Sequence, residues 1–285
     1  MFDIWVIASA VLKFALYLGA LIPTGLILCR LLLGVRDEVF PIRRWIVWGA
    51  VLGLIAAVLG FAIRGTALTG DLSGAFDSEI LGILWSTPVG DALAWRVAGF
   101  ALILLCALLG SRFDLGGLLG GVVVLWSFAA IGHVTDANAM WIRIALIVHL
   151  FCIAFWIGVL APLRRLALNT QDIQTAADIG HRFGQIAMLA IPGLIIAGVL
   201  MSFRLIGGTA GFLTPYGLVL LLKVGVVAGL LALGAANKLR FVPRMRSGDA
   251  YAAQHLAISI RWEWLCVLII LATTAWLTSA LSPPA

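Results

Sequence analysis

GHVTDANAMWIRIALIVHLFCIAFWIG, residues 132–158, is the stretch of sequence that decides the fold. From Met140 onward it is almost continuously apolar, and about 20 such residues are enough for a helix to cross a bilayer. It nevertheless contains His133, Arg143 and His149. A polar side chain at membrane depth costs several kcal/mol unless it is paired or solvated, so this stretch is the first candidate for a functional site.

The composition of the whole chain is that of a membrane protein. The sequence has 285 residues, of which 63% are hydrophobic and 11% are charged, and its mean hydropathy is +1.12. Soluble domains carry about 25% charged residues, so most of this surface must face lipid. The four cysteines lie inside apolar runs, which does not indicate a disulfide framework.

The apolar stretches predict an all-α polytopic fold with eight transmembrane helices. Their length, about 20 residues, favours helices over the shorter alternating strands of a barrel. The predicted spans are 4–33, 44–64, 88–110, 115–133, 139–162, 181–204, 214–238 and 257–280.

The charge pattern predicts the orientation. The net charge is +6, and basic residues cluster on alternate loops: Arg30, Arg36, Arg43 and Arg44, then Arg112, then Arg164, Arg165 and Arg182, then Lys238, Arg240, Arg244 and Arg246. By the positive-inside rule these loops are cytoplasmic, and both termini lie on the external side. Cytoplasmic anchoring therefore explains the basic charge better than nucleic-acid binding. The external segment Glu79–Trp85 is predicted to lie flat at the interface.

The two halves resemble each other, which predicts two four-helix repeats, 1–138 and 139–285. Gly53 precedes Arg64 by the same spacing that separates Gly193 from Arg204. Thr87-Pro88-Val89-Gly90 likewise matches Thr214-Pro215-Tyr216-Gly217. Four spans per half make the repeats parallel, related by an axis along the membrane normal. Aligning Gly158 with Gly25 sets Leu16 opposite His149, so the first half is predicted to scaffold and the second to bind.

A candidate metal site lies at the junction of the fourth and fifth spans. His149 falls about 15 Å below the outer surface by helix rise, and Cys152 shares its face at i+3. An imidazole and a thiol suit a soft metal, with Cu(I) favoured. Nearer the surface, His133, Asp136, Met140 and Met201 could add donors. The alternative is that His149 hydrogen-bonds a neighbouring helix and Cys152 only packs.

Basic residues in the outer half oppose this interpretation. Lys13, Arg64, Arg96, Arg143, Arg204 and Lys223 all fall there. For the deeper ones, Asp91 and Asp136 are the nearest acids by depth, and Glu263 is predicted to pair with Arg261 or a basic loop. Such positive charge would suit an anionic group, for example a haem propionate, a lipid headgroup or a metal chelate.

The chain resembles the CopD copper-resistance family of bacterial inner-membrane proteins. The residues that carry the resemblance are Gly132-His133, His149, Trp156, Gly158, Tyr216-Gly217, Lys223, Asn237, Glu263 and Leu281-Ser282-Pro283-Pro284. The resemblance implies copper handling at the inner membrane, sometimes with a periplasmic copper-binding partner, and it carries this role onto His133 and His149. Family members often have a histidine in the first helix, and this chain has none there.

Three functions stay open at this stage. The first is copper transport or sensing, with capture near His133 and transfer to His149 and Cys152. The second is a b-type haem protein for electron transfer, although His133 and His149 differ in depth by about 10 Å. The third is a structural or partner-recruiting subunit without metal. No Walker A loop is present, and we expect no enzymatic activity.

Overall fold

The computed structural model describes residues 4–131 and 140–284, and all the regular structure in these ranges is helical. Eight segments of the described chain are long and apolar enough to cross a membrane. They are Ile4–Leu33, Ile42–Thr69, Pro88–Leu109, Ser111–Ala129, Met140–Leu168, Thr170–Ile206, Pro215–Arg246 and Ala250–Leu277. The predicted all-α fold with eight candidate membrane spans is confirmed.

The elements follow one another with short connections. The α-helices are α1 (Ile4–Leu33), α2 (Ile42–Thr69), α3 (Ser78–Trp85), α4 (Pro88–Leu109), α5 (Asp114–Trp126), α6 (Met140–Leu168), α7 (Ile173–Ile206), α8 (Pro215–Ala236), α9 (Val242–Arg246) and α10 (Ala250–Leu277). Short 3₁₀ turns are η1 (Leu72–Ala75), η2 (Ser111–Phe113), η3 (Ser127–Ala129), η4 (Thr170–Asp172) and η5 (Thr209–Leu213). The segment η6 (Asn237–Phe241) is a π-helix that continues α8 into α9.

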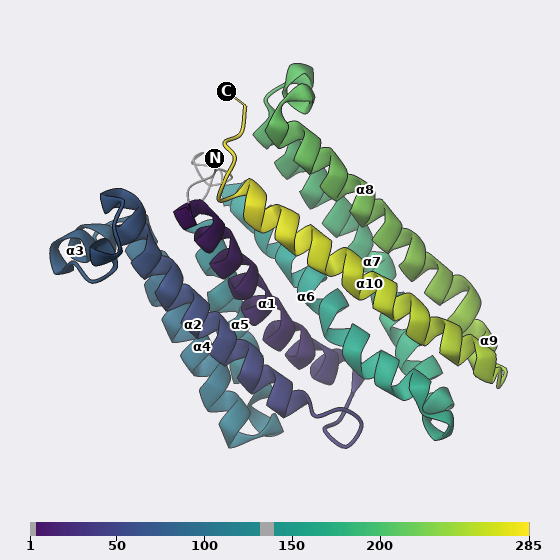
Figure 1. The fold of residues 1–285 in the computed structure, drawn as a ribbon. Coiled ribbons are helices and arrows are strands. Elements are labelled where there is room, and N and C mark those ends of the chain that lie inside the picture. The colour runs from purple at the N-terminus through teal and green to yellow at the C-terminus, as the bar shows by residue number, and fades with distance from the viewer. Residues whose placement is uncertain (1–3, 132–139, 285) are drawn as a thin grey trace.

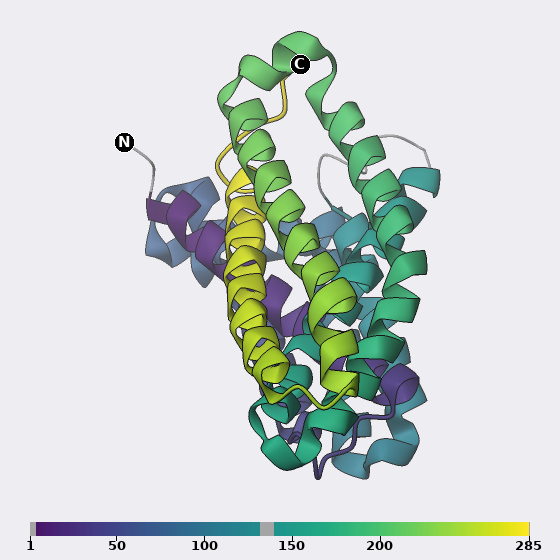
Figure 2. The same cartoon turned by 90° about the vertical axis from the view of Figure 1, so that its right-hand side faces the viewer.

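The long helices form two groups that meet along α1 and α6 (Figure 1). In the first group α1 packs on α2 and α5, and α4 packs on α2 and α5. In the second group α6 packs on α7 and α10, and α8 packs on α10 along most of its length (Figure 2). Both chain termini lie at the same end of the molecule, which we call the terminal end. The division of the chain into two four-helix repeats stays a prediction.

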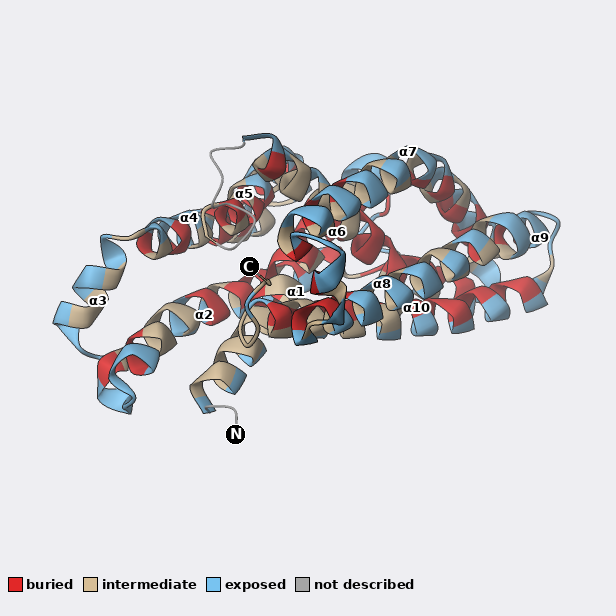
Figure 3. Cartoon of the chain, turned by 90° about the horizontal axis from the view of Figure 1, so that it is seen from above, coloured by how far each residue is buried: buried red, intermediate tan, exposed pale blue. Residues whose placement is uncertain are grey.

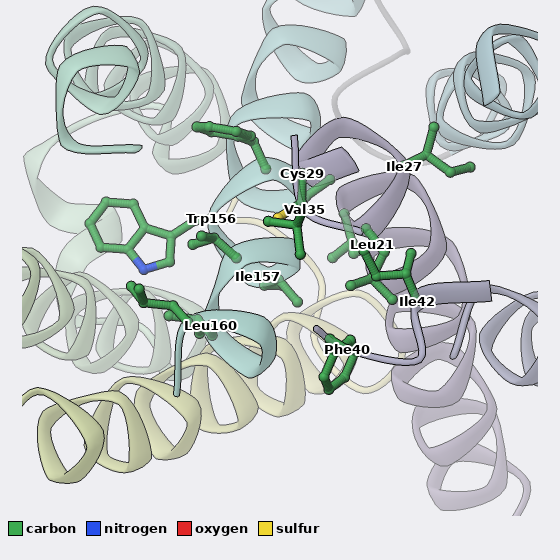
Figure 4. Close-up of a cluster of buried hydrophobic side chains, with 14 of the residues drawn as sticks. Leu21, Ile27, Cys29, Val35, Phe40, Ile42, Trp156, Ile157 and Leu160 are labelled. Carbon is green, nitrogen blue, oxygen red and sulfur yellow. The ribbon is translucent and has the colours of Figure 1, made fainter. Parts of the chain in front are cut away.

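The buried core is centred on α1 and α6. Seen from the terminal end, buried residues face the middle of the molecule, whereas the outer faces of α7 and α8 are exposed (Figure 3). Figure 4 shows part of this core, where Leu21 and Ile42 lie on one side of α6 and the Trp156 indole lies on the other. A smaller cluster near the terminal end joins α7, α8 and α10 through Ile206, Tyr216, Leu220 and Leu277.

Glycine allows α1 and α6 to approach until their backbones touch. A Cβ atom on Gly25 would overlap the Ala154 carbonyl, and one on Gly158 would overlap the backbone of Gly25. Lipid tails give helices little hydrophobic reason to associate, so close packing of small residues supplies much of the attraction. The two glycines that the repeat alignment equates are therefore in direct contact, at the centre of the interface between the groups.

Several helices extend beyond the spans predicted from hydropathy. The α7 helix begins at Ile173 rather than at residue 181, and α10 begins at Ala250 rather than at residue 257. The first turns of both helices carry polar residues, so hydropathy assigns them to loops. A helix can nevertheless continue from the membrane into water. Asp178 on the extension of α7 forms an ion pair with Arg246 at 3.3 Å. Asp249 caps α10 by accepting from Tyr251 and Ala252, and the bond from Ala252 contributes most to a lowered pKa of the Asp249 carboxyl.

The fourth span ends earlier than predicted. Its helical structure stops at Ala129, whereas the prediction ran to residue 133. The Ser127 hydroxyl bonds to the Val124 carbonyl at 2.6 Å and also accepts from Arg96, which stabilises a 3₁₀ turn at this point. The predicted interfacial segment, by contrast, is helical as α3, which Asp77 caps by accepting from Glu79 and Ile80.

We predict that Gly158→Ala destabilises the protein by about 1–3 kcal/mol, because the added methyl group has no space between the two backbones. Gly225→Ala on α8 is the matched control, since a Cβ there meets nothing within 4 Å. Thermal unfolding of the purified proteins in detergent, followed by tryptophan fluorescence, measures the difference. Equal melting temperatures for the two variants would contradict the role of the glycine contact.

Candidate metal site

The α6 helix turns its two candidate ligands away from α1. His149 and Gly158 are separated by two and a half turns at about 3.6 residues per turn, so they lie on opposite sides of the helix. Cys152 and Trp156 follow His149 by about one and two turns and share its side. The face that carries His149, Cys152 and Trp156 is thus turned toward the second group of helices.

Both candidate ligands contact the backbone of α7. The His149 Nδ1 atom lies 3.2 Å from the Leu194 carbonyl, and the Cys152 thiol donates to the Ala190 carbonyl at 3.5 Å. These carbonyls are four residues apart and flank Pro192 within the helix. A Cβ on Gly198 would lie 3.5 Å from the imidazole, so the ring rests directly against α7. The side chains of both candidates lie in the interface between α6 and α7.

The hydrogen bond fixes the tautomer of His149. A backbone carbonyl can only accept, so Nδ1 must carry the proton and donate it to Leu194. The lone pair then resides on Nε2. Metal-binding histidines in proteins have this arrangement, in which the second nitrogen donates to a carbonyl or carboxylate and holds the ring in place. His149 is therefore oriented as a neutral ligand with Nε2 available.

Cys152 and Lys223 complete the surroundings of His149. None of the four cysteines forms a disulfide, and the Cys152 thiol is partly buried. A metal bound to it would displace the thiol proton. The ammonium group of Lys223 on α8 lies within electrostatic range of His149.

The other candidate ligands lie nearer the terminal end. Met201 on α7 is buried and follows Leu194 by about two turns, roughly 10 Å. Met140 is the first residue of α6 and is 56% exposed. His133 and Asp136 fall outside the described residues. Within the described ranges no three His, Cys, Asp or Glu side chains form a group that could hold a metal ion. Of the candidate ligands that the structure describes, His149 and Cys152 are the two that share a helix face and contact α7 side by side.

A buried polar cluster lies beyond Cys152 on the same face of α6. The Trp156 indole donates to Glu263 of α10 at 2.8 Å, and the Asn237 amide donates to the other oxygen of this carboxylate. The prediction that Glu263 pairs with Arg261 or a basic loop was wrong, because Glu263 is 2% exposed and its partners are the buried Trp156 and Asn237. Trp156 and Asn237 were noted only for the family resemblance. An acidic residue inside an apolar span was the signal for such a cluster.

Three outer-half basic residues of the first group gather near the terminal end. Lys13, Arg64 and Arg96 lie within electrostatic range of one another. Asp91 is not the partner of Arg96, whose guanidinium donates to Ser127 at 3.1 Å and lies 5.3 Å from the centre of the Phe128 ring. Lys13 donates to the Thr278 carbonyl at the end of α10. Of these three cations, Lys13 and Arg96 are therefore hydrogen-bonded to neutral groups.

Two sequence-family profiles match separate parts of the chain. The profile described as copper resistance protein D-like, N-terminal domain, matches residues 1–142, and the profile described as copper resistance protein D matches residues 177–277. No solved structure matches the chain.

Two curated relatives are similar to most of the chain. The inner membrane protein YebZ of Escherichia coli (strain K12) is 26% identical over 229 residues, which cover 78% of this chain and 79% of the relative. The copper transport protein CutJ of Bacillus subtilis (strain 168) is 27% identical over 267 residues, which cover 88% of this chain and 48% of the relative. The chain thus spans about half the length of CutJ. With eight candidate membrane helices among its described residues and these matches over both halves, the chain belongs to the copper resistance protein D family of multi-pass inner-membrane proteins.

Proposed function

We propose that this protein carries copper across the inner membrane and that His149 and Cys152 form the station through which the ion passes. The observation that carries the proposal is the orientation of His149, which donates from Nδ1 to Leu194 and leaves Nε2 free to bind a metal. Cys152 lies on the same face and adds a soft donor. Soft ligands select Cu(I) over hard divalent ions. Copper is the substrate here, and the protein needs no catalytic group.

The proposed station lies within the membrane-spanning part of α6, where a transported ion must be held during its passage. His149 follows the first residue of α6 by nine residues, or about 14 Å of helix. On the external side, His133, Asp136, Met140 and Met201 are the proposed capture residues, which take copper from the periplasm or from a periplasmic copper-binding protein. Copper bound to one thiolate and one neutral imidazole carries no net charge as Cu(I), which lowers the cost of holding it in the membrane.

We predict that His149→Ala and Cys152→Ser each weaken Cu(I) binding at least about tenfold, because each removes one of two soft donors. His255→Ala is the matched control, since His255 is exposed near the opposite end and stacks on Phe241. Competition with a chromogenic Cu(I) chelator measures the affinities of the purified proteins in detergent. Unchanged affinity in both ligand variants would contradict the assigned station.

Elemental analysis and an absorption spectrum of the same samples test the other two functions. Copper without a Soret band is the expected result. Iron with a Soret band that His149→Ala abolishes would replace the copper station by a b-type haem. Neither metal after copper loading would leave a structural or partner-recruiting subunit.

We predict that Met201→Leu slows copper uptake at low copper concentration and leaves the equilibrium affinity of the purified protein within about twofold, because Met201 is two turns away from His149. Met188→Leu is the matched control on the same helix, where the side chain is 58% exposed. Initial uptake of copper into cells depleted of the metal gives the rates. A rate for Met201→Leu equal to that of Met188→Leu would remove Met201 from the capture site.

We predict that both termini lie on the periplasmic side, because the basic loops lie at the end of the molecule opposite the termini. Alkaline phosphatase fused after Pro284 is active only in the periplasm, so colonies carrying this fusion should show activity. The same enzyme fused in the α9–α10 turn at Gly248 should be inactive. The reverse pattern would invert the orientation.

A further inference from the structure

The copper station leaves one buried charge unexplained. Asp114 and Glu263 are the two buried acidic side chains of the described residues. Asp114 forms an ion pair with Arg30 at 2.9 Å. Glu263 has no ion pair within the described ranges, and its two partners, Trp156 and Asn237, are neutral. The membrane interior therefore holds a carboxyl group that no cation neutralises in the described structure.

Such a carboxyl group is suited to change its protonation state. Burying an isolated carboxylate costs several kcal/mol even after the protein relaxes. The two N–H donors offset part of this cost, because hydrogen bonds to the charged form stabilise it. Protonation removes the remaining cost. Burial therefore favours the protonated form of Glu263, and the two hydrogen bonds favour its ionised form.

Asn237 can serve both protonation states. Its Nδ2 donates to Glu263, while its Oδ1 is buried and has no partner among the described residues. The two ends of an amide have nearly the same shape, so a turn of the amide exchanges them. After that turn Oδ1 accepts from the protonated carboxyl of Glu263. The hydroxyl of Ser259, one turn earlier on α10, is likewise buried and unsatisfied, and it offers a second place for a proton or a water.

The backbone holds Asn237 in this position. Asn237 opens the π-helix η6, and π-turns inside α-helices occur preferentially at functional sites. The next residue, Lys238, donates to the Gly184 carbonyl of α7 at 2.8 Å, which fixes the turn against its neighbour. Pro243 follows at the start of α9. The irregular segment thus places an amide against α10.

Trp156 lies between the copper station and Glu263. It follows His149 by seven residues, so the carboxyl cluster lies about 10 Å farther from the terminal end. The indole packs edge-on against Phe183 of α7 with ring centroids 5.7 Å apart. A Cβ on Gly234 of α8 would meet the same ring at 2.7 Å. Trp156 therefore fills the space between the copper station and the Glu263 cluster, and it is hydrogen-bonded to Glu263.

The other titratable and charged groups around Glu263 leave it unpaired. On the elements packed against α10 and on α10 itself, the described ones are Lys13, Tyr17, Cys29, Arg30, Arg143, His149, Cys152, Arg164, Arg165, Tyr216, Lys223, Lys238, Arg240, Arg244, Arg246, Tyr251, His255, Arg261 and Cys266. Of the basic residues at the end of the molecule opposite the terminal end, Arg30, Arg244 and Arg246 have ion pairs of their own. Cys266, nearly one turn along α10, lies within electrostatic range of the carboxyl.

We propose that Glu263 is a proton-exchanging site on the cytoplasmic side of Trp156, and that it couples proton binding to copper binding at His149. This inference rests on the proposed copper station. Relative to the free Cys152 thiolate, Cu(I) binding makes the station more positive by one charge, so an ionised Glu263 favours the bound state and a protonated Glu263 does not. The proton leaves Glu263 for water on the cytoplasmic side when copper occupies the station, and it returns when copper leaves. At about 10 Å and an effective dielectric constant near 20, the effect on copper affinity is on the order of tenfold. By linkage, copper reduces proton affinity by the same factor.

Infrared spectroscopy of the copper-free protein in lipid tests the protonation itself. Difference spectra between low and high pH should contain the C=O stretching band of a buried carboxylic acid. Glu263→Gln should remove this band, and Asp114→Asn, which changes the ion-paired buried acid, should leave it. Trp156→Phe should shift its frequency, because the carboxyl loses a donor. A wild-type spectrum without the band, or a band that persists in Glu263→Gln, would overturn the proposal.

Cu(I) affinity measured across the same pH range tests the coupling. Affinity in the wild type should rise with pH by about tenfold more than in Glu263→Gln. The same pH dependence in both proteins would overturn the coupling. If the infrared band behaves as expected and neither protein binds Cu(I), the proton site stands and the copper station falls. This separates failure of the present proposal from failure of the proposed function.

Discussion

The contact between Gly25 and Gly158 sets the orientation of α6, and the rest of the site depends on that orientation. Because the backbones of α1 and α6 touch at these glycines, α6 cannot rotate about its axis without bringing a larger side chain into a clash with α1. His149 lies half a turn away from Gly158 around the helix axis, so fixing the glycine against α1 fixes the imidazole against α7. Cys152 and Trp156 are oriented by the same constraint. One interface between the two helix groups thus positions residues that are not part of it.

Trp156 then connects the helices of the second group. It bonds to Glu263 on α10, packs on Phe183 of α7 and lies over Gly234 of α8. This matters most for α8, whose buried residues are Tyr216, Gly217 and Leu220 near one end. The opposite end of α8 is held through Asn237 and Lys238 instead. In lipid, a few polar contacts and close-packed small residues replace the large apolar core of a soluble protein.

Hydropathy predicted the spans well because lipid imposes a length and a composition on each of them. It placed the starts of α7 and α10 too late, since a helix that leaves the membrane keeps its geometry while its residues become polar. The family profiles and the eight spans confirm the family and the fold class predicted from sequence. The partners of Glu263 were beyond prediction because Trp156 and Asn237 are 107 and 26 residues away along the chain. Periodicity shows which face a residue occupies and gives no information about the helix that meets it.

The two groups differ in a way that bears on the path of a cation. In the first group Lys13, Arg64 and Arg96 concentrate positive charge near the terminal end, and the buried Leu16 stands where the repeat alignment places the counterpart of His149. A cation at 10 Å from one such charge is repelled by about 1.7 kcal/mol at an effective dielectric constant of 20. The second group also has three basic residues in its outer half, Arg143, Arg204 and Lys223, of which Lys223 lies within electrostatic range of His149. Positive charge alone therefore does not separate the two groups, and the proposed preference of copper for the second group rests on His149, Cys152 and the acidic Glu263 beyond them.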